Sequence, residues 1–148
     1  MNYQQPLGVI KDINGRFTYD NLALFPDSLV LVKGSYGYII LRSIQLQFGA
    51  LGALLLHPLV KRSQARRLAT ISKHSPGELA RLNPKNRLIG YDRVVDAQLK
   101  KSLLTGRLTI NLADGTTQKL TWPKGTNKYE QVAPLLRQAL GTKLSEVA

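Results

Sequence analysis

The chain contains no cysteine and only two histidines among its 148 residues. The lack of thiols excludes disulfide bonds and thiolate chemistry. His57 borders an apolar run, where a satisfied or half-exposed ring is expected rather than a catalytic base. No glycine-rich phosphate loop is present, because Gly34-Ser35-Tyr36-Gly37 has neither the lysine nor the helix start that such a loop needs. We therefore predict a noncatalytic protein that uses no cofactor and no metal ion.

Acidic residues are also scarce, nine against 21 basic ones, and the net charge of +12 is unevenly distributed. Residues 1–35 carry three basic and three acidic side chains and are neutral overall. Residues 36–90 carry nine basic side chains against the single acid Glu78, a net charge of +8, and residues 91–148 carry nine against five, a net charge of +4. A concentrated positive charge indicates an anionic partner, either a membrane or a nucleic acid.

Long hydrophobic runs are missing. The longest, Phe48 to Leu56, has nine residues, whereas a membrane-spanning helix needs about 20. Extending it backwards to that length brings in Arg42, and extending it forwards brings in Pro58. The first six residues have neither a basic nor an apolar stretch and predict no signal peptide. The expected location is the cytoplasm, or the cytoplasmic face of a membrane.

The apolar run is followed at once by cations, and this junction is the most informative feature of the chain. The pattern fits a core helix, an interfacial helix at a membrane or an oligomer contact, and Gly49 and Ala53, four residues apart, favour close approach of another helix. Candidate apolar contact residues are Phe48, Leu51 and Leu55. Candidate residues for binding an anionic surface are Lys61, Arg62, Arg66 and Arg67, each worth about 1 kcal/mol near an anionic leaflet.

Nucleic acid is the alternative partner, because an isoelectric point near 10.2 is typical of such binders. Proteins that bind single strands usually interleave exposed aromatic side chains with their cations. Between Lys61 and Arg87 the chain has no aromatic residue apart from His74. This absence favours a membrane over a nucleic acid.

The first third of the chain has strand patterns and the middle has helical ones. Three strands are predicted at Gly8–Ile13, Phe17–Phe25 and Leu29–Val32, with a hairpin turn at Asn14-Gly15 and another turn at Pro26-Asp27-Ser28. From Tyr38 the apolar residues recur every three or four positions, as on a helix. Pro58 should end or kink that helix, and a second, polar helix is expected at about Lys61–Ser72.

A short helix should begin at the capping box Ser75-Pro76-Gly77-Glu78 and run through Leu82, which completes a helical insertion at about 36–82. The last third returns to strands, predicted at Arg87–Ile89, Val94–Lys100, Leu108–Leu112 and Leu120–Trp122, with a hairpin turn at Asp114-Gly115. Lys128–Leu140 predicts an amphipathic C-terminal helix with Gly141 as its C-cap.

Several motifs of the second half resemble bacterial proteins with a pleckstrin-homology-like (PH-like) domain. They are Asn83-Pro84-Lys85-Asn86-Arg87-Leu88-Ile89, Tyr91-Asp92 with Val94 and Ala97, Asp114-Gly115, Trp122, Asn127-Lys128-Tyr129-Glu130 and Pro134-Leu135-Leu136. The resemblance covers residues 17–143. It implies an α+β fold, in which an antiparallel bent sheet or split barrel is closed at one end by the C-terminal helix. It implies a fold and not a biochemical role.

The family's usual phosphoinositide site is a basic loop between the first two strands. Here that loop holds only Lys11 and Arg16, opposed by Asp12, so headgroup-specific binding is not expected. The whole chain, residues 1–148, is predicted to be one PH-like domain that acts as a membrane-peripheral or protein-binding adaptor through its insertion. The alternatives are a nucleic-acid-binding protein and an assembly protein whose insertion is a homo-oligomer interface.

Overall fold

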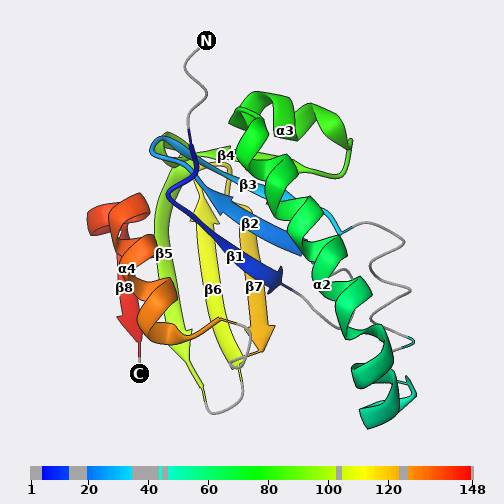
Figure 1. Cartoon of the computed structure of the whole chain (residues 1–148). Helices are drawn as coiled ribbons and strands as arrows, with labels where there is room; N and C mark the ends of the chain where they lie inside the picture. The colour runs from blue at the N-terminus through cyan, green and yellow to red at the C-terminus, as the bar shows by residue number, and fades with distance from the viewer. Residues whose placement is uncertain are drawn as a thin grey trace.

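The computed structural model describes residues 5–13, 20–34, 44, 47–102, 105–123 and 127–147. Its strands form two four-stranded sheets, with helices at their sides (Figure 1). The fold is therefore α+β, as predicted. The strands lie in two four-stranded sheets that are not closed into a barrel, and the finer prediction of a PH-like bent sheet or split barrel stays a prediction.

The first sheet contains β1 (Gly8–Ile13), β2 (Asp20–Leu24), β3 (Ser28–Val32) and β4 (Arg87–Gly90), side by side in that order and all antiparallel. The predicted Asn14-Gly15 turn and the first residues of the second predicted strand lie outside the described residues. The pairing of β1 with β2 is nevertheless the one that a hairpin there requires.

The second sheet has the order β7 (Thr117–Pro123), β6 (Thr105–Leu112), β5 (Val94–Lys101) and β8 (Leu144–Val147). A 3₁₀ turn, η1 (Tyr91–Arg93), joins it to the first sheet. The pairs among β5, β6 and β7 are antiparallel, as the alternating patterns predicted. Strand β8 was not predicted, and it pairs in parallel with β5.

The main core lies between the two sheets and under helix α4 (Tyr129–Leu140). Inward residues of both sheets, such as Leu22, Leu29 and Ile110, are fully buried there. Helix α4 contributes Val132, Ala133, Leu136 and Leu140 to the same cluster, and Gly141 follows as its C-cap, in the left-handed region with φ 58°. The predicted C-terminal helix that closes the core is thereby confirmed.

The insertion between β3 and β4 contains α2 (Gly49–Lys73) and α3 (Pro76–Leu82). The prediction that Pro58 separates two helices is wrong, because α2 continues through it. The capping box at the start of α3 is confirmed, with Ser75 and Glu78 bonded to each other's backbone N–H. Ile71 of α2 and Leu79 of α3 pack on the outer face of the first sheet, where they form a second cluster with Ala23, Phe25 and Val30.

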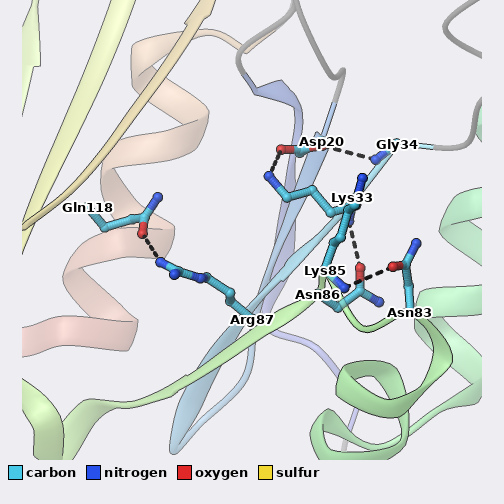
Figure 2. A network of polar contacts seen from close by, with 8 residues as sticks. All are labelled: Asp20, Lys33, Gly34, Asn83, Lys85, Asn86, Arg87 and Gln118. Atoms are coloured by element: carbon cyan, nitrogen blue, oxygen red, sulfur yellow. Dashed lines mark hydrogen bonds and ion pairs between the residues drawn. The ribbon is translucent and has the colours of Figure 1, made fainter.

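Two buried polar side chains hold the points where the insertion leaves and re-enters the sheet (Figure 2). The Asp20 carboxylate accepts hydrogen bonds from the Lys33 ammonium at 3.1 Å and the Gly34 backbone N–H at 3.0 Å, just after β3. The Asn86 side chain, just before β4, accepts from the Lys33 N–H at 2.8 Å and donates to the Leu79 carbonyl at 2.7 Å. Both ends of the insertion are therefore fixed next to each other on one sheet.

Candidate functional site

The N-terminal half of α2 carries large apolar side chains in solvent. In Figure 1 this half of the helix extends past the strands of the first sheet, whereas the other half lies near them. The three predicted contact residues Phe48, Leu51 and Leu55 have exposed fractions of 62%, 62% and 64%. Leu54 and Leu59, which were not singled out from the sequence, are exposed as well. The core alternative for these residues is therefore wrong.

The opposite side of α2 faces the protein. Val60 and Ile71 are buried, and Gln64 lies between them on the same side of the helix. Its side-chain amide donates to the carboxylate of Asp12 at 3.5 Å and to the side-chain oxygen of Asn21 at 3.4 Å. These contacts attach the central and C-terminal parts of α2 to the first sheet and leave its other side free.

The four predicted cations do not share one environment. Lys61, Arg62 and Arg66 are exposed, and within the described residues none of them forms an ion pair with an acidic side chain. Arg67 is half-buried, and its guanidinium donates to the Gln64 side-chain oxygen at 3.2 Å. Arg67 thus lies toward the side of α2 that faces the sheet, and the other three cations face solvent.

The exposed leucines and arginines lie on the same face of α2. Leu51 and Arg62 are eleven residues apart, and so are Leu55 and Arg66. Eleven residues make about three full turns of an α-helix and about 16 Å along its axis, so residues at this spacing lie on the same face. We call Phe48, Leu51, Leu55, Arg62 and Arg66 the α2 outer face: its N-terminal part is apolar and its C-terminal part cationic. The eleven-residue spacing was visible in the sequence, but the exposure of this face was not.

The cations of the α2 outer face have no charge partner on their own helix. Residues 49–73 contain no aspartate or glutamate, so the usual ion pairs between residues four apart on a helix are absent. Such ion pairs would neutralise the arginines locally. Without them, the arginines remain available to an external anion.

Catalytic or metal-binding groups are not gathered elsewhere in the described part of the chain. Among these residues no three His, Asp or Glu side chains come together as metal ligands. His57 is exposed on α2, and the His74 ring contacts the Thr70 carbonyl at 2.7 Å. Trp122 is buried in the main core. Across the same residues, no helix combines the length and the apolar character needed to cross a bilayer.

No protein-family model matches this chain, and no curated protein is significantly similar to it. The function is therefore inferred from the α2 outer face itself.

Proposed function

We propose that this protein attaches peripherally to an anionic membrane through the α2 outer face and acts there as a noncatalytic adaptor. One observation supports this most: exposed leucines are followed, along one face of one helix, by exposed arginines that form no ion pair within the described residues. Acyl chains cover apolar side chains, and anionic headgroups attract cations at the adjacent surface. The cytoplasmic leaflet, which carries anionic lipids, is the proposed target.

Burial of the leucines and attraction of the arginines to anionic headgroups contribute comparable free energies of binding. Full burial of one leucine side chain stabilises binding by about 1.5–3 kcal/mol. Each exposed arginine near an anionic leaflet contributes about 1 kcal/mol. Leu51 and Leu55 together with Arg62 and Arg66 therefore provide enough free energy for reversible attachment, and neither pair is negligible.

The arrangement favours a tilted helix. In a helix that lies flat on a bilayer, apolar and charged residues occupy opposite sides. On the α2 outer face they occupy the same side and are separated along the axis by about 16 Å. A tilt that lowers the N-terminal end places Phe48, Leu51 and Leu55 among the acyl chains and leaves Arg62 and Arg66 among the headgroups.

The other two partners fit this face less well. A nucleic acid offers phosphates to the arginines, but nothing that covers a row of exposed leucines. Two copies of the chain joined through this face would place arginine beside arginine in a parallel pair. In an antiparallel pair they would place arginines against leucines. Both arrangements are unfavourable.

A PH-like arrangement of the scaffold is part of the proposal. Its support is the order of the elements: the strands β1 to β7 are followed by α4, whose Val132 and Leu136 cover the core. The insertion between β3 and β4 and the added strand β8 are departures from that pattern. In this view the sheets and α4 are the scaffold, and α2 is the membrane-contacting element.

Vesicle flotation tests the proposal. The wild type should float with vesicles that contain phosphatidylserine and bind vesicles of phosphatidylcholine alone more weakly. Leu51→Glu with Leu55→Glu should abolish flotation, because charged side chains resist transfer into acyl chains. The melting temperature should stay the same, since both leucines are exposed. Loss of the circular dichroism signal in this variant would show that the two leucines are needed for folding, and this would contradict an exposed binding site.

The arginines need a control matched in charge. Arg62→Gln with Arg66→Gln should weaken binding to phosphatidylserine vesicles by about 30-fold, the equivalent of about 2 kcal/mol. Lys100→Gln with Lys119→Gln removes the same charge from exposed positions on the second sheet and should have a much smaller effect. Equal effects of the two pairs would show that only net charge matters and would reject the α2 outer face as the site.

A further inference from the structure

A second surface feature lies at the other end of the insertion. An open hollow of about 740 Å³ is present where α3 meets the ends of β3 and β4, which is within the size range of known ligand sites. Its apolar lining includes Pro26, Pro76 and Leu88. Leu88 is 42% exposed although it lies on a strand, so the hollow offers apolar surface without a partner in the described structure.

The hollow is formed by a glycine and held in shape by its neighbours. Gly90 has no side chain, and a Cβ atom there would lie 2.5 Å from a carboxylate oxygen of Asp92. The Tyr91 N–H donates to the Asp27 carbonyl at 3.1 Å, and the Tyr91 hydroxyl donates to the Phe25 carbonyl at 2.6 Å. Burial of Tyr91 raises the pKa of its hydroxyl, so it stays neutral and keeps this bond. The walls are therefore preformed.

Among the described residues, the charged side chains that line the hollow are Asp27 and Asp92, in a chain that is otherwise strongly basic. Both are exposed. Within the described residues, the Asp27 carboxylate accepts a hydrogen bond from the Ser28 hydroxyl at 3.2 Å, and the Asp92 carboxylate accepts none. The hollow thus combines apolar walls with negative charge at its edge.

Two nearby cations offset these two carboxylates only in part. Arg93 pairs with Asp114 at 3.6 Å on the second sheet. The ammonium of Lys143 donates to the backbone carbonyl of Tyr91 at 2.5 Å. More distant cations are screened beyond about 8 Å at physiological ionic strength. Because Arg93 is paired with Asp114, the two carboxylates of the hollow face one ammonium, that of Lys143, and the remaining negative charge favours a cation.

We propose that this hollow docks a segment of another protein that presents a lysine or arginine flanked by an apolar side chain. The cation would lie between Asp27 and Asp92, and the apolar neighbour would pack on Leu88 and Pro76. Charge complementarity and the preformed apolar wall are the grounds for this partner chemistry. The docking site is independent of membrane attachment, since no residue is shared with the α2 outer face.

The position of the hollow fits an adaptor, and this one point rests on the proposed membrane function. Helix α3, which begins at Pro76 and Gly77, follows the C-terminal end of α2 (Figure 1). Leu51 is the third residue of α2 and therefore lies near its N-terminal end. The 22 residue steps from Leu51 to Lys73 span about 33 Å of helix. With the leucines in a bilayer, the hollow would lie well away from it, where its carboxylates are not repelled by anionic headgroups and a soluble partner has access.

Titration of the isotope-labelled full chain with short peptides, in the absence of vesicles, tests the docking proposal. The probe is acetyl-Leu-Lys-Leu-amide, and the same peptide with glutamine or glutamate in place of lysine is its control. The lysine peptide should cause saturable amide shifts at residues 27–28 and 88–92. Asp92→Asn and Asp27→Asn should each weaken this binding at least fivefold, whereas Glu130→Gln, which removes an exposed charge on α4, should leave it unchanged.

Several results would overturn the proposal. They are shifts that do not saturate, equal binding of the lysine and glutamine peptides, or an equal effect of Asp92→Asn and Glu130→Gln. Saturable binding of calcium alone at the same residues, with no response to the lysine peptide, would identify a metal site instead. The titration contains no lipid, and the flotation contains no peptide. A negative peptide titration therefore does not contradict membrane attachment, and negative flotation does not contradict peptide docking.

Discussion

Glu146 is a residue whose ionisation is strongly controlled by the surrounding structure. The Arg137 guanidinium donates two hydrogen bonds to its carboxylate, at 2.8 and 2.6 Å, and the Tyr129 hydroxyl donates a third at 2.5 Å. These bonds, first from Arg137 and then from Tyr129, lower the pKa of Glu146 to about 2. They join β8 to α4, two elements that follow each other in the chain but lie in different layers.

The lowered pKa of Glu146 predicts how the stability of the protein depends on pH. Because it lies below the ordinary value of 4.5, the carboxylate adds stability that is fully present above about pH 4.5 and is lost as the pH falls toward about 2. Glu146→Gln should therefore have a lower melting temperature than the wild type at about pH 6, and the two should converge near pH 2. Thermal unfolding followed by circular dichroism across this range measures it. A difference that stays constant with pH would contradict the assigned role.

The buried polar residues could not be identified from sequence. Asp20, Asn21 and Asn86 are ordinary polar residues in the printed chain, yet all three are buried. Asp20 and Asn86 hold the ends of the insertion through partners up to 53 positions away. Pairings of this length depend on the sheet register, which local patterns do not specify.

For single elements, the bounds of the strands were predicted better than those of the helices. Gly8–Ile13 has the predicted bounds, and β3 to β7 differ from their predictions by a few residues at most. Strand β8 was missed because it has only four residues, mostly exposed, and its partner β5 lies more than 40 positions earlier. Alternation over so short a stretch gives no usable signal.

Helix α2 was predicted as two helices because Pro58 removes a backbone N–H and crowds the preceding turn. The helix continues because good helix formers stand on both sides, Leu54 to Leu56 before the proline and Gln64 to Arg67 after it. Leu54, whose carbonyl loses its partner, is 76% exposed, so solvent has access to the helix where this hydrogen bond is missing. The loss is therefore tolerated in this part of the helix.

The second prediction concerns this proline. Pro58→Ala should restore the hydrogen bond and raise the local stability of α2, by up to about 3 kcal/mol. Amide exchange of residues 54–62 should slow, whereas that of β5 and β6 in the main core should not change. The melting temperature should also move little, since the N-terminal half of α2 lies outside both core clusters. Faster exchange in α2 would contradict a continuous helix.

For the molecule as a whole, the sequence predicted an α+β protein with a helical insertion and a C-terminal helix on the core, and these are present. It did not predict how the sheets divide, since closure into a barrel depends on tilt and stagger between distant strands. The candidate residues were also found from sequence, but their shared face was not. A run of apolar residues does not reveal whether the protein covers it, and here Phe48, Leu51 and Leu55 are uncovered.

The last prediction concerns how the charge of the whole molecule acts at a membrane. Raising the salt from about 0.1 to 1 M shortens the screening length from about 10 to 3 Å and should weaken binding to phosphatidylserine vesicles. Burial of the leucines is not screened, so the wild type should keep residual binding at high salt, and Leu51→Glu with Leu55→Glu should keep none.

Arg62→Gln with Arg66→Gln should bind with a clearly shallower salt dependence, whereas Lys100→Gln with Lys119→Gln should follow the wild type. An oligonucleotide bound through phosphates alone should dissociate completely over the same range. Complete loss of wild-type vesicle binding at 1 M salt, in parallel with the oligonucleotide, would show that the leucines do not enter the bilayer. The charge of residues 36–90, rather than the apolar part of α2, would then account for all of the binding.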